Sequence, residues 1–127
     1  MPAYVLDASA LLATLQDEPG AAEIDARLPQ ACISAVNLSE VVAKLTERGT
    51  PTDIALGFMA ALDLDVRPFE RAQAEHAGWL RPATRRLGLS LGDRACLALA
   101  AELEATAVTT DRNWARLDVG IAVEVVR

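Results

Sequence analysis

The segment SLGDRACLALAAELEATAVTTD, residues 90–111, predicts one helix, a tight turn and one strand. Ser90 followed by Asp93 matches a capping box at a helix start, and the residues behind it are almost all apolar. A helix that is apolar on nearly every side is buried on nearly every side, so we expect it in the middle of the domain. Residues 106–110 are short and β-branched, which is typical of an interior parallel strand. This segment therefore indicates an α/β fold.

The same segment places two acids at the ends of these elements. Asp93 lies in the first turn of the predicted helix, and Asp111 lies just past the predicted strand. In a βαβ arrangement both places face the carboxyl edge of the sheet, where ligand sites of open α/β sheets occur. Either acid alone has a simpler explanation as a helix cap. A functional interpretation therefore requires further acids at the same edge.

The rest of the chain alternates short apolar strands with helices. Asn37 is expected to cap a helix that ends at Gly49, and Pro82 is expected to bend or break a helix over 70–86. Pro68 makes the strand around it an edge strand. We find no linker or repeat, so residues 1–127 are predicted to form one domain, a mainly parallel sheet flanked by helices. Further strands are expected at 4–6, 31–36, 64–69 and 121–126, and further helices at 10–15, 21–28, 54–62 and 113–117.

Composition narrows the class of protein. The chain has 127 residues, 52% of them hydrophobic, which is enough to bury a core without disulfide bonds or a structural metal. No apolar run approaches the ~20 residues that span a bilayer, and no signal peptide is recognisable. Cys32 and Cys96 lie far apart in apolar surroundings, so buried reduced thiols are expected. These features predict a cytoplasmic protein without membrane contact.

Charge restricts how the chain could bind a polyanion. The formal net charge is −6, whereas a nucleic-acid-binding domain usually carries a positive one. The acids dominate the first half of the chain, and most of the arginines lie between Arg67 and Arg116. A contact with nucleic acid would therefore need a local arginine patch. Our candidates for guiding RNA are Arg81, Arg85, Arg86 and Arg112, with a solvated helix face as the alternative for the first two.

Four acids are expected at one edge of the sheet, each at a strand end or near a helix start. These are Asp7, Glu40, Asp93 and Asp111, here called the acidic quartet, with the hydroxyls of Ser9 and Thr110 beside them. Crowded carboxylates raise one another's pKa unless a cation joins them. Oxygen-only ligands favour Mg²⁺ or Mn²⁺ over zinc. Such a site can hold a phosphodiester oxygen and activate a water. His76, the only histidine, lies far from the quartet in sequence, so a His base is not expected.

Four ordered motifs, VLDASAL at 5–11, NLSEV at 37–41, LGDRACLALA at 91–100 and TTDRNW at 109–114, resemble those of PIN-domain ribonucleases, and VapC-type toxins most of all. The resemblance covers essentially the whole chain. It implies a PIN-like three-layer sandwich, Mg²⁺- or Mn²⁺-dependent RNA cleavage, a homodimer and inhibition by a small cognate antitoxin. It carries the acidic quartet over as catalytic, metal-binding residues, with Ser9 and Thr110 in support.

Asn113 stands where some members carry a further acid, which leaves the number of metal ions open. Trp114 stands where the motif has a large aromatic, and we expect it to pack in the core.

Rival interpretations remain open from the residues alone. A haloacid-dehalogenase-type phosphatase needs a second acid two residues after the first, where this chain has Ser9. A receiver-like signalling domain needs a lysine at the end of a late strand, but the sole lysine is Lys44. A PIN-like nuclease that is not a toxin, or a catalytically idle metal-binding or interaction domain, would fit the same motifs. The sequence does not identify the RNA that is cleaved.

Overall fold

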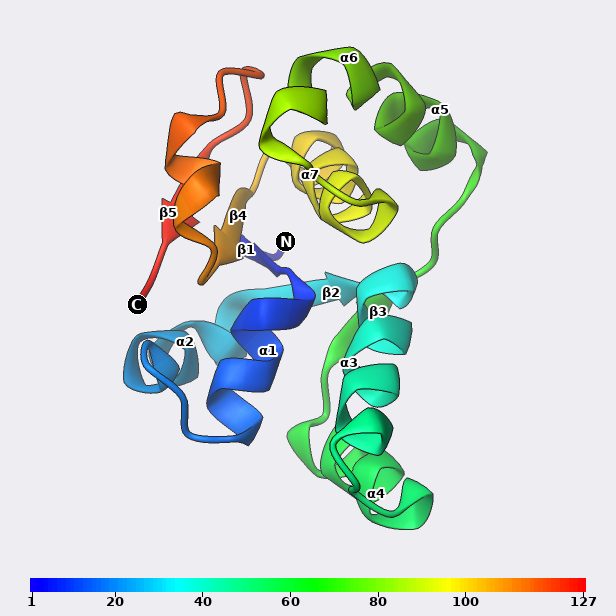
Figure 1. The fold of residues 1–127 in the computed structure, drawn as a ribbon, viewed down its shortest axis with the longest axis vertical. Coiled ribbons are helices and arrows are strands. Elements are labelled where there is room, and N and C mark those ends of the chain that lie inside the picture. Colours follow the sequence, from blue (N-terminus) through cyan, green and yellow to red (C-terminus); the bar gives the residue numbers. More distant parts are fainter.

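A computed structural model describes residues 1–127 as a five-stranded sheet between two layers of helices (Figure 1). The strand order is β3-β2-β1-β4-β5, and all four pairings are parallel. The predicted three-layer α/β sandwich is therefore confirmed. The strands are β1 (Tyr4–Leu6), β2 (Ala31–Ser34), β3 (Asp65–Arg67), β4 (Thr106–Thr109) and β5 (Val123–Val125). The helices are α1 (Ala8–Leu15), α2 (Ala21–Arg27), α3 (Ala35–Glu47), α4 (Thr52–Leu62), α5 (Arg71–Trp79), α6 (Arg81–Thr84) and α7 (Leu91–Leu103), with 3-10 turns η1 (Leu28–Gln30), η2 (Arg85–Leu87) and η3 (Arg112–Arg116).

The alternation of side chains along the strands divides the core in two. Leu6, Ile33 and Val108 are register partners and pack against α1 to α4 on one face of the sheet. One residue earlier in each strand, the side chains point to the other face and pack against α7 and Trp114. Trp114 is 1% exposed, which confirms its predicted place in the core. Both faces of the sheet are thus covered, as a parallel sheet requires.

Residues 90–111 form the predicted helix, turn and strand. In α7, Ser90 Oγ accepts from Asp93 N at 3.2 Å and Asp93 Oδ2 accepts from Ser90 N at 2.9 Å, so both bonds of the capping box are present. The helix is buried along most of its length, and β4 lies inside the sheet between β1 and β5. Because α7 leads into β4, which runs parallel to β1, the first turn of α7 lies at the carboxyl edge of the sheet.

Two local predictions need correction. The helix after β2 begins three residues earlier than expected, because Ser34 Oγ accepts from Val36 N at 3.2 Å and acts as the cap. Asn37 is therefore inside α3, and Glu40 lies in its second turn rather than its first. The helix expected over 70–86 is broken, as predicted, but at Leu80, with Pro82 seated in the first turn of α6.

Cys32 and Cys96 are free and buried, as expected. None of the helices combines the length and the apolar character that crossing a bilayer demands.

Candidate active site

The acidic quartet lines one hollow of about 570 Å³ at the carboxyl edge of the sheet. The chain runs from β1 to β2 on one side and places β4 on the other, so the strand order reverses at β1. Ligands of open parallel sheets bind at such a switch point. We call this the acidic hollow; its lining residues are Asp7, Ala8, Ser9, Leu12, Glu18, Glu40, Ala43, Lys44, Glu47, Arg48, Asp93, Thr110 and Asp111.

Asp7 is the most buried member of the quartet, with 2% of its surface exposed. It follows β1 directly and caps α1, because its Oδ1 accepts from Ala10 N at 2.8 Å and from Ser9 Oγ at 2.7 Å. Its Oδ2 accepts from Thr109 Oγ1 at 2.5 Å. These donors come from α1 and from the end of β4, so the carboxylate joins the two central strands at their carboxyl ends.

A hydroxyl pair reinforces this junction. Ser9 Oγ accepts from Thr110 N at 3.0 Å and lies 3.2 Å from Thr109 Oγ1, which itself accepts from Asp111 N at 3.0 Å. The Ser9 hydroxyl therefore contacts Asp7, beside which the sequence analysis expected it. The Thr109 hydroxyl contacts Asp7 as well, which the sequence analysis did not predict, while Thr110 lines the hollow and contributes its backbone N–H to Ser9. Alternation along a strand could have given this answer, since Thr109 lies on the strand and Thr110 just beyond it.

Burial of Asp7 raises its pKa to about 6, against the opposing effect of its three hydrogen bonds, and the negative charge of Asp93 adds to the rise. A carboxyl with this pKa is largely ionised at pH 7, but burial makes its charge less favourable than that of an exposed carboxyl, and a nearby positive charge would offset this.

Asp93 is electrostatically linked to the other three acids. Burial raises its pKa, the bonds to Ser90 oppose that rise, and the charge of Asp111 adds to it. The charge of Asp93 in turn raises the pKa of Asp7 and of Glu40. The quartet therefore behaves as one group of repelling carboxylates, in which Asp93 interacts with each of the other three.

Glu40 reaches the hollow from α3. Burial raises its pKa, while a hydrogen bond from Asn37 Nδ2 to Glu40 Oε1, 2.9 Å long, opposes the rise. The same Nδ2 donates to the carbonyl oxygen of Gly92 at 2.9 Å. Asn37 thus joins α3 to the first turn of α7. The sequence analysis, which expected Asn37 to be a helix cap, did not predict this contact.

Asp111 is exposed at the rim of the hollow and caps η3, with Oδ1 accepting from Asn113 N at 2.9 Å. Asn113 therefore contributes a backbone N–H to Asp111, and its side chain does not line the hollow.

The donor set fits Mg²⁺ or Mn²⁺ by its chemistry. Six acids line the hollow, the quartet together with Glu18 and Glu47, and no histidine or cysteine does; their hard oxygen donors suit such cations. Burial raises the pKa of Asp7, so a cation bound beside this carboxyl would favour its ionised form. No three of the side chains that could serve as ligands lie close enough together to chelate one ion.

The predicted RNA-binding arginines do not line the acidic hollow. Arg81 donates to the carbonyl oxygen of Leu89 at 3.3 Å, and Arg86 lines a separate hollow together with Arg116. Arg112 follows Asp111 directly, but its side chain is exposed outside the hollow. The cations that do line it are Lys44 and Arg48, one and two helical turns beyond Glu40 on α3. Lys44 and Arg48 lie four and eight residues after Glu40, a helical spacing that the sequence prediction missed.

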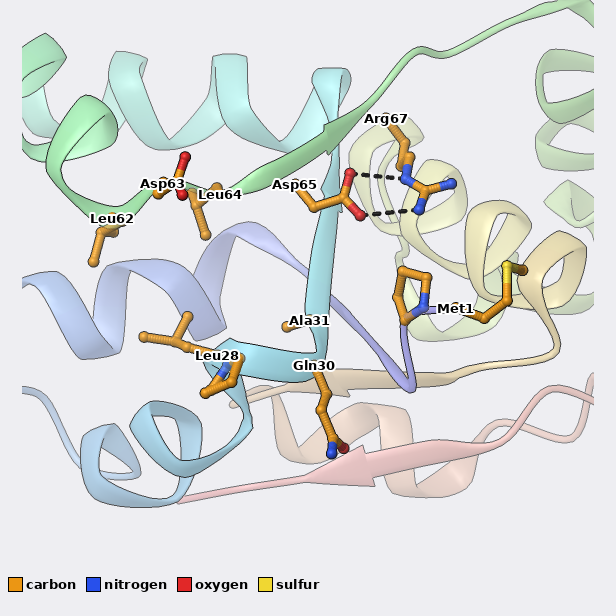
Figure 2. A pocket seen from close by; sticks show the side chains of 11 residues that line it. Met1, Leu28, Gln30, Ala31, Leu62, Asp63, Leu64, Asp65 and Arg67 are labelled. Atoms are coloured by element: carbon orange, nitrogen blue, oxygen red, sulfur yellow. Dashed lines mark hydrogen bonds and ion pairs between the residues drawn. The ribbon is translucent and has the colours of Figure 1, made fainter.

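A second hollow, of about 670 Å³, lies at the opposite edge of the sheet, where β2 and β3 begin (Figure 2). Its charged pair is satisfied internally, because Arg67 Nε and Nη2 donate to the two carboxylate oxygens of Asp65 at 2.8 and 2.9 Å. Met1, Leu28 and Leu62 contribute apolar lining. Of the acidic quartet, none lines the larger hollow, and the candidate active site is therefore the smaller acidic one.

Comparison with known proteins gives a consistent result. The sequence profile of the PIN domain matches residues 4–120. No curated protein sequence shows significant similarity to the chain. Among solved structures, VapBC2 from Rickettsia felis bound to a promoter DNA fragment superposes with a TM-score of 0.77 at 16% identity, covering 98% of both chains. VapBC-5 from Mycobacterium tuberculosis, of the VapBC family of toxin–antitoxin systems, gives 0.62 at 26% identity and 99% coverage of both chains. VapC20 from M. tuberculosis, a toxin that cleaves the sarcin–ricin loop, gives 0.74 at 15% identity, covering 98% of this chain and 99% of that one. The predicted resemblance to VapC-type proteins is confirmed.

Proposed function

The chain belongs to the PIN domain family, and from this premise we propose that it is a Mg²⁺- or Mn²⁺-dependent endoribonuclease, the toxin of a toxin–antitoxin pair. The VapBC relatives support the toxin assignment, and the sarcin–ricin cleavage by VapC20 supports RNA as the substrate. The proposal treats residues 1–127 as one nuclease domain.

One observation carries the proposal: the four carboxylates of the acidic quartet, from four separate segments, line a single hollow at the switch point of the sheet. Burying like charges together is costly, and the raised pKa values of Asp7, Glu40 and Asp93 reflect that cost. A purely structural role would be served equally well by amides or hydroxyls. A site that must attract a divalent cation accounts for the carboxylates.

Within this proposal each residue has a distinct role. Asp7, Glu40, Asp93 and Asp111 would hold the cation after their side chains move closer together than they lie here. The cation would supply positive charge to stabilise a phosphodiester transition state and would acidify a water. Ser9 and Thr109 orient Asp7 by hydrogen bonds, and the Thr110 backbone fixes Ser9 in turn. Asn113 orients Asp111 through its backbone N–H.

RNA must approach a hollow that is rich in negative charge, so cations near its rim would lower the barrier to binding. We assign this role to Arg112, next to Asp111, and retain Arg81, Arg85 and Arg86 as contacts for more distant nucleotides. Phosphate contacts of this kind add affinity but little sequence preference.

The proposed partners are a cognate antitoxin and a second copy of the chain. A basic antitoxin side chain in the acidic hollow would form charge-assisted bonds with the carboxylates and compete with the metal. For the homodimer, α4 offers a largely unpartnered apolar surface, with Ile54, Leu56 and Phe58 exposed. An RNA substrate and two reduced cysteines suit a cytoplasmic location.

The test is to incubate the purified chain with labelled RNA, with and without Mn²⁺. Internal cleavage that requires the metal is expected. No cleavage under either condition would leave the idle metal-binding or interaction domain as the better assignment. Growth arrest on expression, relieved by the product of the adjacent reading frame, separates a toxin from a PIN nuclease of another role. Harmless expression at high level with all four acids intact would contradict the toxin assignment.

A further inference from the structure

Two residues outside the acidic quartet determine where the Glu40 carboxylate lies. The first is Asn37, which is fully buried within α3, one turn before Glu40. Its Nδ2 donates to Glu40 Oε1 and to the carbonyl oxygen of Gly92, both at 2.9 Å. Both partners can only accept hydrogen bonds, so the amide must present its NH₂ group to them.

The other end of the Asn37 amide makes no compensating contact. Its Oδ1 is buried and has no hydrogen-bond partner within the chain. A buried, unpaired carbonyl oxygen is destabilising, and each such group in a native structure calls for a reason. Stability alone therefore gives a poor account of an asparagine here. The two bonds made by its NH₂ group, which join Glu40 to the start of α7, give a better one.

The second residue is Gly92, which immediately precedes Asp93 in the first turn of α7. A Cβ placed on Gly92 would overlap both carboxylate oxygens of Glu40. The backbone there is helical and needs no glycine for its own conformation, since residue 92 is not among those with positive φ. The missing side chain instead makes room for a carboxylate that lies directly against the helix.

We infer that Asn37 and Gly92 are positioning residues: Asn37 binds the Glu40 carboxylate to the first turn of α7, and Gly92 leaves the space that the carboxylate occupies. The inference rests on the proposed function, because it explains how an acid from α3 is held beside Asp93 on α7. Neither residue touches the substrate in this account. Both act through Glu40.

The decisive variant is Gly92→Ala. The atoms in its way are the far end of a flexible side chain, so the helix can keep its place while the carboxylate swings aside. A misplacement of about 1 Å at a catalytic group can cost about 100-fold in rate. We therefore expect kcat to fall about 100-fold, with KM for RNA and the circular-dichroism spectrum unchanged. Gly78→Ala is the matched control, because Gly78 is exposed within α5 and a Cβ there meets nothing. It should cleave RNA like the wild type.

A double-mutant cycle tests whether Gly92 acts through Glu40. Glu40→Gln keeps an oxygen for Asn37 to bind but removes the charge. In that background Gly92→Ala should lower the rate no further. An equal additional loss would mean that the Ala acts elsewhere, for example on Asp93, and would overturn the inference. Asn37→Ala should lower kcat in the same non-additive way if it folds; Gly92→Ala decides the matter if it does not.

Different results would refute the positioning role of Gly92 and the proposed function. Wild-type protein that cleaves RNA alongside an equally active Gly92→Ala variant would refute the positioning role alone. Wild-type protein that cleaves no RNA would refute the proposed function. The positioning role would then be tested by thermal denaturation with Mn²⁺: a stabilisation lost in Gly92→Ala supports it, and equal stabilisation of both proteins overturns it.

Discussion

Replacing Asp7 with Asn should stabilise the metal-free protein at neutral pH, because Asp7 is held in a place that opposes its charge. Burial raises the pKa of Asp7 from 3.8 to about 6. The folded protein therefore binds the proton more tightly than the unfolded chain. The contribution of this group to stability is fully present below pH 4 and is lost as the pH rises to about 6.

The size of the effect follows from the shift. A change of one pKa unit corresponds to about 1.4 kcal/mol, so the rise in the Asp7 pKa lowers the free energy of unfolding at pH 7 by about 3 kcal/mol. Asn cannot ionise and escapes this loss. Its Oδ1 can keep the bonds from Ala10 N and Ser9 Oγ, and its Nδ2 can donate to Thr109 Oγ1. The Thr109 hydroxyl can then donate to Ser9 Oγ, which lies 3.2 Å away.

The assay is urea unfolding of wild type and Asp7→Asn in the presence of a chelator, at pH 4 and pH 7. The advantage of the variant should be small at pH 4 and should grow by about 3 kcal/mol by pH 7. Asp118→Asn, which removes the same charge from an exposed position, is the control and should show little difference. An Asp7→Asn advantage that does not grow between pH 4 and pH 7 would refute this reasoning.

Three further results are expected. Mn²⁺ should raise the melting temperature of the wild type at pH 7 and much less at pH 5, where the raised pKa leaves much of Asp7 protonated. Thermal denaturation measures the melting temperature, and an equal gain at both pH values would contradict this expectation. Thr109→Val should lower the free energy of unfolding by about 1–3 kcal/mol, because it leaves Asp7 Oδ2 and the backbone N–H of Asp111 without their partner; urea unfolding measures the loss, and an unchanged midpoint would count against the junction described here. Replacing Arg85, Arg86 and Arg112 with Ala should weaken RNA binding and flatten its dependence on salt, measured by fluorescence anisotropy; an unchanged slope would locate the RNA surface elsewhere, with Lys44 and Arg48 as the next candidates.

The sequence predicted the elements and the location of the acids correctly where local capping chemistry and the hydrophobic pattern agreed. The capping box and the apolar run of α7 predicted both a buried helix and the edge of the sheet at which Asp93 lies. Strand-end acids at Asp7 and Asp111 predicted a shared edge because parallel strands all end there. Pro82 predicted a break between α5 and α6, although the break occurs at Leu80.

The sequence did not predict individual contacts where two nearby side chains could form the same kind of hydrogen bond. Both Ser34 and Asn37 are good helix caps, and only the packing of α3 against α7 assigns the cap to Ser34 and frees Asn37 to bind Glu40. Likewise, Thr109 and Thr110 are adjacent hydroxyls, and the strand pairing decides which one points at Asp7. Contacts across 55 residues, such as that of Asn37 with Gly92, leave no periodic signal in a single sequence.

We propose that the acidic quartet is a metal site for RNA cleavage. Asp93→Asn is the sharpest test of this proposal, because Asp93 is electrostatically linked to the other three acids. Wild type and variant are compared at the same Mn²⁺ concentration on the same labelled RNA, with circular dichroism to confirm that both are folded. The account predicts metal-dependent cleavage by the wild type, and no cleavage by a folded Asp93→Asn variant. A variant that cleaves RNA as fast as the wild type would contradict it.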